Sequence, residues 1–167
     1  LKEISQDPER TLIVVDPRRT ESAELADIHL AVKPGRDAWA LSAMIAHVIQ
    51  QSLIPTNWLN DNVIGLDRVL EKFSVIDVEG YATFAGLNPA DVRAAAEAIA
   101  KAKTSAYYED LGVQMAPHST LLSYLNLLMM TITGHFGRPD TLAPLKSLIG
   151  QFFAVHLSLI HISEPTR

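Results

Sequence analysis

The stretch TLIVVDPRRTESAELADIHLAVKPGRD, residues 11–37, decides the fold. It opens with the apolar run Leu12 to Val15, which is rich in β-branched residues and too short for a buried helix. Such a run predicts a fully buried parallel strand. The strand ends at Asp16-Pro17, because proline cannot donate to a sheet ladder. A polar connection at 21–27, which we expect to be helical, leads to a second predicted strand at 28–32.

Each predicted strand is followed by a loop that combines a carboxylate, a guanidinium and turn-forming residues. The first loop consists of Asp16, Pro17, Arg18, Arg19 and Thr20, and the second of Lys33, Pro34, Gly35, Arg36 and Asp37. In open α/β sheets, ligands bind at the carboxyl ends of strands. A carboxylate can accept hydrogen bonds from a guanine edge or from ribose, and a guanidinium can hold a phosphate. The alternative is that the first loop is a surface turn and that the second caps the next helix. Each loop considered on its own favours this alternative.

The remaining sequence predicts helices that alternate with weaker strand signals. Asp37 and Asn88 are expected to cap two of the helices, and the first of these is expected to pack on the sheet. Residues 76–86 show little periodicity and are interpreted as a connection. The predicted fold class is therefore α/β, with a mostly parallel sheet flanked by helices. Further helices are predicted at 38–51, 56–73, 89–102 and 120–133. The segment at 56–73 is expected to form two short helices around Gly65, and Leu121 and Leu122 are expected to face inward in the last helix. A strand is predicted at 105–108, followed by a loop at 110–115.

Composition narrows the classes of function. The chain has 167 residues, of which 48% are hydrophobic and 20% charged, and this composition predicts one globular domain with a real core. The net charge of -5 and the absence of a basic cluster exclude nucleic acid as an expected partner. There is no cysteine, which excludes disulfides and thiolate metal ligation within this chain. The longest apolar helix candidate, 121–132, is too short for direct membrane insertion. The compartment stays open between cytoplasm and periplasm.

Two segments resemble a known family. VVDPRRTESAELADIHLAVKPGRDAWALSAM, residues 14–44, is similar to the nucleotide-binding segment of the molybdopterin oxidoreductases, the dimethyl sulfoxide reductase family that includes formate dehydrogenases and periplasmic nitrate reductases. LGVQMAPHSTLLSYLNLLMMTITGHFGRP, residues 111–139, resembles a later stretch of the same family, in the same order and at about the same spacing. The resemblance implies a Rossmann-like, nucleotide-binding portion of a larger multidomain enzyme, present here as an internal fragment.

The resemblance also implies a cofactor and residues that bind it. In this family the two loops hold the guanosine diphosphate part of a molybdopterin guanine dinucleotide, whose bis form carries molybdenum or tungsten in the parent enzyme. Carried over, the first loop supplies Asp16, Pro17, Arg18, Arg19 and Thr20, and the second Gly35, Arg36 and Asp37, with Asp37 at the guanine edge. Leu111, Gln114 and Met115 would approach the pterin, although Gln114 is displaced by one position from the family pattern. His118 and His135 are interpreted as a cap and a turn residue, and the alternative is contact with pterin or substrate.

Other implied parts of the enzyme lie outside this chain. In the family, the metal ligand and the cysteines of a 4Fe-4S cluster lie upstream, so we assign no catalytic and no metal-binding residue here. The chain alone is expected to be inactive. Its expected partners are the remaining domains of the parent chain and an iron-sulfur electron-transfer subunit. Residues 157–167, LSLIHISEPTR, resemble a translated sequencing adapter, which leaves residues 1–156 as the partial cofactor-binding domain.

Rival functions fail on their motifs. A nicotinamide or flavin enzyme needs a glycine-rich turn after the first strand, and no glycine occurs before Gly35. The motifs of phosphate-loop hydrolases, serine hydrolases and zinc peptidases do not occur either. The remaining alternative is a degenerate, non-catalytic α/β binding subunit of a redox complex that has lost the cofactor.

Overall fold

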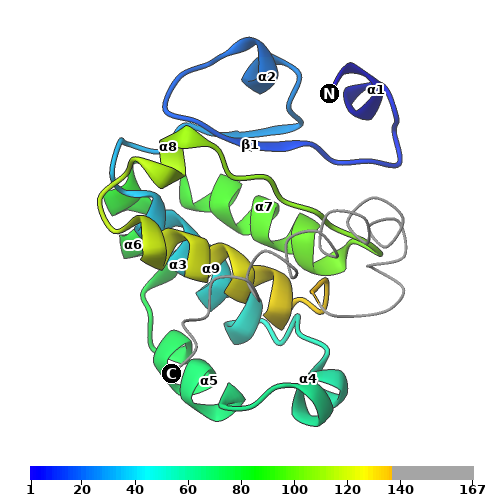
Figure 1. The fold of residues 1–167 in the computed structure, drawn as a ribbon, viewed down its shortest axis with the longest axis vertical. Coiled ribbons are helices and arrows are strands. Elements are labelled where there is room, and N and C mark those ends of the chain that lie inside the picture. Colours follow the sequence, from blue (N-terminus) through cyan, green and yellow to red (C-terminus); the bar gives the residue numbers. More distant parts are fainter. Residues whose placement is uncertain (137–167) are drawn as a thin grey trace, which may run out of the picture.

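A two-stranded parallel sheet and nine helices make up residues 1–136, the part of the chain that the computed structural model describes (Figure 1). The adapter-like tail expected at residues 157–167 falls outside the described residues. In chain order the elements are α1 (Lys2–Ser5), β1 (Ile13–Val15), α2 (Glu21–Glu24), β2 (Ile28–Leu30), α3 (Asp37–Gln50), α4 (Thr56–Asn62), α5 (Leu66–Ser74), α6 (Val78–Ala85), α7 (Pro89–Lys101), α8 (Leu111–Gln114) and α9 (Ser119–Ile132).

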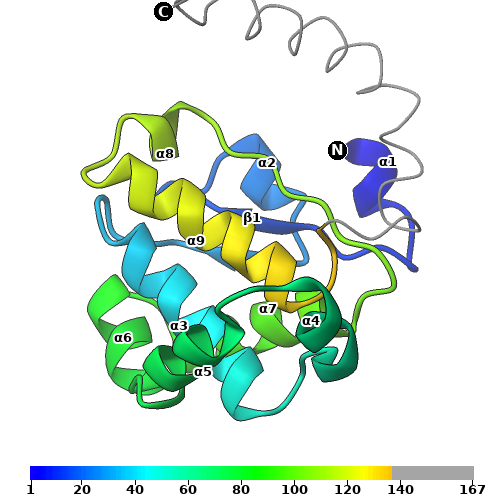
Figure 2. The same ribbon diagram turned by 60° about the horizontal axis from the view of Figure 1, so that its bottom comes forward.

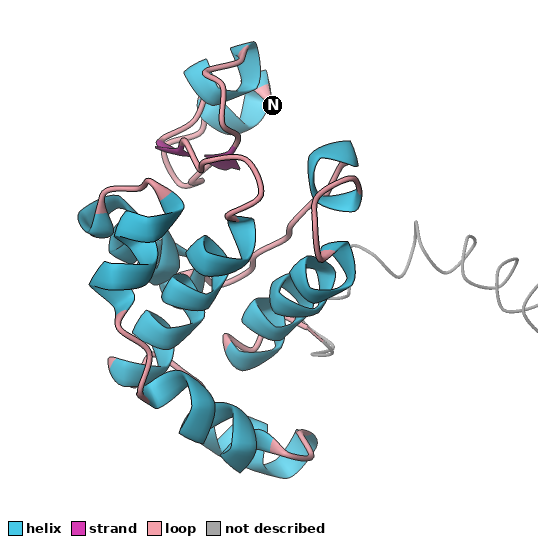
Figure 3. Ribbon diagram, turned by 90° about the vertical axis from the view of Figure 1, so that its left-hand side faces the viewer, coloured by secondary structure: helices cyan, strands magenta, loops and turns pink. Residues whose placement is uncertain are grey.

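The sheet confirms the predicted parallel pairing. Ile13 lies opposite Ile28 and Val15 opposite Leu30, and α2 forms the crossover between the strands. The expectation that the first strand is fully buried is wrong, since Val15 is 47% exposed. Among the described residues β1 has a neighbouring strand on one side only. Figure 3 shows the two strands at one end of the molecule, with the main helical layer on one side of them.

Helix α3 is the centre of the core. Residues 43–48 are all buried, and Ile45 and Val48 have no exposed surface. The expectation that this helix packs on the sheet is corrected, because it packs mainly against α5, α6, α7 and α9. Arg36 occupies the N-cap position and Asp37 lies in the first turn, one residue later than predicted. A carboxylate in the first turn is still stabilised by the helix dipole.

Helix α6 replaces the connection predicted at 76–86. Its buried residues Val78, Ala82 and Ala85 follow helical spacing. Gly86 ends the helix at a φ of 84°, the left-handed conformation in which glycine is favoured. The start and stop signals, Asp77 and Gly86, were present in the sequence, but the short apolar pattern between them was too brief to stand out.

The predicted strand at 105–108 is also wrong. No strand is assigned there, and Tyr107 and Tyr108 are 41% and 87% exposed. A strand needs a neighbour to satisfy its backbone, and the ladder in residues 1–136 contains only β1 and β2. The loop predicted after it is the short helix α8. Helix α9 begins and ends one residue earlier than predicted, and of the two leucines expected to face inward Leu122 is buried but Leu121 is 45% exposed.

Three histidines have structural roles. His47 is buried, and its Nε2 lies 3.1 Å from Oε1 of Glu97, which joins α3 to α7. The pKa of Glu97 is lowered by its hydrogen bond from Lys101 and then by the one to His47. His135 is buried between the Thr133 hydroxyl at 2.9 Å and the Ala102 carbonyl at 3.0 Å. His118 occupies the N-cap position of α9, without a hydrogen bond from its side chain to the helix.

No helix among the described residues has the length and apolar character needed to cross a membrane.

Candidate nucleotide-binding edge

The pairing of β1 with β2 sends both predicted loops out of the same edge of the sheet. Because the strands are parallel and Val15 lies opposite Leu30, residues 16–20 and 31–37 leave from neighbouring positions. Helix α8 lies at the same end of the sheet in two views (Figures 1 and 2). A Cβ added to Gly35 would lie 3.9 Å from Cδ of Pro117, just after α8. The structure thus brings the two loops and the segment after residue 110 together.

The first loop has a fixed backbone and exposed cations. The Asp16 amide donates to the Leu30 carbonyl at 3.2 Å, and Oδ1 of Asp16 accepts from the Arg18 amide at 2.7 Å. Nε2 of His29 lies 2.9 Å from the Asp16 carbonyl oxygen. The Thr20 hydroxyl caps α2 by accepting from the Ala23 amide at 3.4 Å. Pro17, Arg18 and Arg19 are exposed. Two guanidinium groups therefore stand on a rigid turn beside a carboxylate.

The second loop is a tight turn that leads directly into α3. The Arg36 amide donates to the Lys33 carbonyl at 3.0 Å, and Gly35 has a φ of 77°, which explains the glycine. The Arg36 side chain turns towards α6, where Nη1 donates to the Phe84 carbonyl at 2.5 Å. Its guanidinium carbon also lies 4.3 Å from the centre of the Phe84 ring. Asp37 is partly exposed in the first turn of α3.

The third segment is fastened to α9 by one carboxylate. Glu109 accepts from the Ser123 hydroxyl and from the Asn126 side-chain amide, both at 2.6 Å. The side chain of Asp110 then caps α8 by accepting from the Leu111 amide at 2.8 Å. The residues predicted to face the pterin are exposed on this helix and just after it, namely Leu111, Gln114 and Met115. The segment is held at its base and presents apolar and amide side chains outwards.

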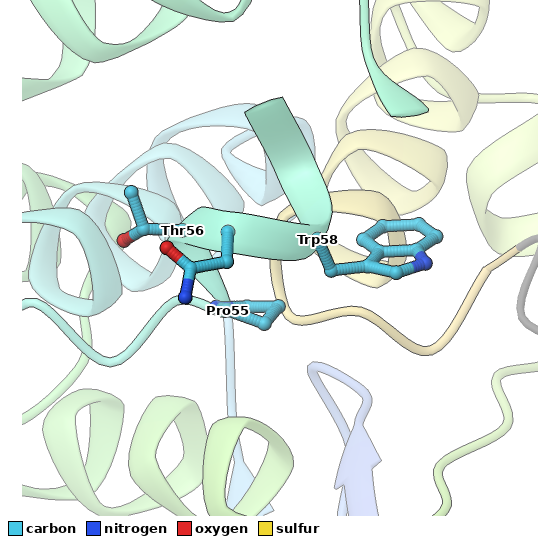
Figure 4. Close-up of a pocket in the computed structure, with 4 residues that line it drawn as sticks. Pro55, Thr56 and Trp58 are labelled. Carbon is cyan, nitrogen blue, oxygen red and sulfur yellow. The ribbon is translucent and has the colours of Figure 1, made fainter. Parts of the chain in front are cut away.

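Two hollows in the surface of the described residues lie elsewhere. One, of about 370 Å³, is lined by residues 55–58 at the start of α4, and Figure 4 shows Pro55, Thr56 and Trp58 around it. The other, of about 400 Å³, lies between α4 and the end of α9 and includes Phe136. Helix α4 is at the opposite end of the molecule from the sheet (Figure 1). Both hollows are open and shallow, so we define the candidate site by the strand ends and their chemistry. No cluster of three metal-ligating side chains occurs within residues 1–136.

Sequence reasoning missed the residues that hold the second loop from the side of α6. These are Phe84, which contacts Arg36, and Tyr81, which like Phe84 packs against the ring of Trp39 on α3. They were missed because residues 76–86 were interpreted as a connection. The Asp77 and Gly86 signals could have identified a helix there, but not its contact with a loop that lies 48 residues earlier.

Comparison with known proteins identifies relatives for about three quarters of the chain. No family model matches. The chain is 28% identical over 127 residues to the assimilatory nitrate reductase catalytic subunit of Bacillus subtilis, covering 76% of this chain and 18% of that protein. It is 30% identical over 133 residues to formate dehydrogenase H of Escherichia coli, covering 77% and 18%. A solved structure of acetylene hydratase from Pelobacter acetylenicus matches with a TM-score of 0.73 and 26% identity, covering 77% of this chain and 18% of that one.

The fold and these relatives define an α/β segment shared by large catalytic subunits. The resemblance found in the sequence is confirmed: the chain is homologous to part of the catalytic subunits of the molybdopterin oxidoreductases, the dimethyl sulfoxide reductase family. It spans about a fifth of the length of the curated relatives it matches.

A first prediction concerns the segment that leads to α8. The pKa of Tyr107 is raised by burial of the phenol and, to a smaller extent, by the charge of Glu109. We expect Glu109→Gln to lower this pKa, although not to its ordinary value, because burial remains. The tyrosinate absorbance of each chain, taken as a difference from its Tyr107→Phe counterpart, measures the change. Glu79→Gln, on α6, is the control, and an unchanged Tyr107 pKa in Glu109→Gln would contradict the assignment.

Proposed function

We propose that this chain forms part of the binding site for the guanosine diphosphate end of a molybdopterin guanine dinucleotide, in the catalytic subunit of a molybdenum or tungsten oxidoreductase. The observation that carries the proposal is the exit of two loops, each with a carboxylate and a guanidinium, from one edge of a parallel sheet. In the parent enzyme the cofactor supplies the redox chemistry, and the protein binds and orients it.

The side chains at this edge fit such a ligand. Arg18 and Arg19 are exposed on a rigid turn, where guanidinium groups can hold phosphates. Only one oxygen of Asp16 is used by the turn, which leaves the other for a ribose hydroxyl. Asp37 is partly exposed and can accept a pair of hydrogen bonds from a guanine edge. We propose that Leu111, Gln114 and Met115, which are exposed, meet the pterin, since their segment adjoins Gly35 through Pro117.

The names of the relatives support a role in binding over a role in one particular reaction. They include a nitrate reductase, a formate dehydrogenase and an acetylene hydratase. A segment common to proteins with such different reactions is expected to serve something that they share. We propose a shared cofactor for that role, and we assign no substrate. An oxidoreductase parent agrees with the reductase and dehydrogenase among the relatives, and a 4Fe-4S cluster in the parent is proposed from the family resemblance alone.

The guanine contact predicts selective binding. The chain is expected to bind guanosine diphosphate more tightly than adenosine diphosphate, and Asp37→Asn should weaken guanosine diphosphate binding by about tenfold or more, since hydrogen bonds to a charged group contribute about 1.5–3 kcal/mol. Isothermal titration calorimetry measures both. Asp91→Asn is the matched control, because Asp91 also lies in the first turn of a helix, α7, and is exposed. Equal affinity for both nucleotides, or equal losses in the two variants, would refute the proposal.

One observation favours the second candidate, a degenerate binding subunit that has lost the cofactor. The Arg36 guanidinium is engaged by Phe84, so one of the three arginines at the edge is drawn away from a ligand. The same calorimetry decides between the two candidates. A chain that folds but binds no guanosine nucleotide would favour the degenerate subunit.

We also propose that this chain alone catalyses no redox reaction. It contains no cysteine, and the metal and cluster ligands of the family lie in segments that this sequence does not include. We expect no reduction of viologen dye by the purified chain with formate, and no oxidation of reduced dye with nitrate. The E. coli relative, formate dehydrogenase H, is the positive control for the formate assay. Turnover that depends on substrate would contradict this proposal without touching the proposal of nucleotide binding.

The remaining domains of the parent chain are the proposed partners of an apolar surface on α9. Leu121, Tyr124 and Leu127 are 45%, 52% and 40% exposed and succeed one another at three-residue intervals on the helix. Neighbouring apolar side chains of this size on a surface are typical of a face that another domain covers. An iron-sulfur subunit is the second proposed partner, from the family resemblance.

Charged residues on this surface should improve the solubility of the chain. We expect the double substitution Leu121→Glu and Leu127→Glu to raise the soluble fraction and to reduce self-association in size-exclusion chromatography. The melting temperature should change by only a few degrees, because both side chains are partly exposed already. The control is Leu122→Glu, which buries a charge at a position 1% exposed and should prevent cooperative folding. A wild-type chain that is already monodisperse and as soluble as the double variant would argue against a covered surface.

A further inference from the structure

The end of α6 contacts the second loop at both of its ends. The Lys33 amide donates to the Ala85 carbonyl at 2.9 Å, at the start of the loop. At the other end, Arg36 donates to the Phe84 carbonyl and stacks on the Phe84 ring. Between them, the Lys33 side chain crosses Gly86 so closely that an added Cβ would lie 2.7 Å from its Cγ. Residues 84–86 therefore hold the loop at both of its ends.

An aromatic cluster fixes the ring on which Arg36 rests. The Trp39 ring lies 4.6 Å from that of Tyr81 and 4.7 Å from that of Phe84, measured between centroids. Trp39 follows Asp37 by two positions, and residues two apart on a helix do not face each other. The cluster therefore lies on a different side of α3 from Asp37, so it does not form a stacking surface for a base that Asp37 would meet. Its contacts instead join the first turn of α3 to α6.

We infer that Arg36 is a positioning residue, whose guanidinium anchors the second loop to Phe84 and so sets the direction of Asp37, and that it does not contact the phosphates of the ligand. The inference rests on the proposed function of this edge. It revises the expectation for Arg36 that came from the family resemblance. Arg36 anchors the end of the loop that leads into α3, whereas the Lys33 amide ties the start of the loop to Ala85.

The test measures the binding of two ligands, guanosine diphosphate and guanosine, to distinguish an anchoring role of Arg36 from a contact with the phosphates. An anchor affects both alike, so Arg36→Gln should weaken both by the same factor, about three- to tenfold. Phe84→Leu removes the ring and should weaken both by about threefold. The double variant should be no weaker than Arg36→Gln alone, because both changes break one contact. Arg36→Lys should not restore affinity, since lysine keeps the charge but lacks the planar group. Calorimetry on the full chain gives each affinity.

The control is Arg93→Gln. Arg93 also contacts α6, through Glu79 at 3.1 Å, but does not touch the loop, so both affinities should be unchanged. A loss for guanosine diphosphate that greatly exceeds the loss for guanosine, or rescue by Arg36→Lys, would overturn the inference in favour of a phosphate contact. Variants that melt earlier but bind both ligands normally would also overturn it.

A measurement without ligand tests the inference even if the wild-type chain binds neither guanosine diphosphate nor guanosine. Such a lack of binding would refute the proposed function itself. With Trp58→Phe as background, Trp39 is the one remaining tryptophan of the two in the sequence. Acrylamide quenching of its fluorescence should increase in Arg36→Gln, because Phe84 is released. Unchanged quenching in Arg36→Gln would show that Arg36 anchors nothing.

Discussion

The burial of α3 constrains the rest of the structure. Residues 43–48 are buried on every side of the helix, and α5, α6, α7 and α9 pack around it. Because the helix begins at Asp37, the last residue of the second loop, its position in the core also fixes where the loop ends. A ligand-binding loop built in this way is rigid at one end by virtue of hydrophobic packing, which reduces the conformational entropy lost on binding.

The sequence predicted those parts of the fold that depend on neighbouring residues. The paired apolar runs and the cap at Asn88 are local signals, and the structure has the strand pair and the helix start where they were predicted. Burial and packing partners depend on distant segments, and there the predictions fail. Val15 is exposed because β1 is an edge strand in the described residues, and α3 packs on helices because four of them surround it. Neither the exposure of Val15 nor the packing partners of α3 follow from the hydrophobic periodicity of a single segment.

The candidate site shows the same division. Its location followed from a topological rule, since parallel strands deliver their loops to one edge, and the structure has that pairing. The direction of each side chain did not follow from it. Arg18 and Arg36 have the same chemistry in the sequence, yet Arg18 is exposed while Arg36 is held by a carbonyl 48 residues away. A residue type that suits phosphate is therefore weaker evidence for a ligand contact than an unengaged side chain of that type.

The charge of Asp37 determines which part of the proposed nucleotide each of the two loops would bind. The start of a helix normally attracts phosphate, because its amides and its dipole favour negative charge. At the start of α3 the Asp37 carboxylate already supplies that charge, and it would repel a phosphate placed beside it. In the first loop, by contrast, the exposed guanidinium groups of Arg18 and Arg19 offset the charge of Asp16, one oxygen of which already accepts from the Arg18 amide. Electrostatics therefore favours the phosphates of the proposed nucleotide at the first loop and its base at the second, so the two loops together would orient it.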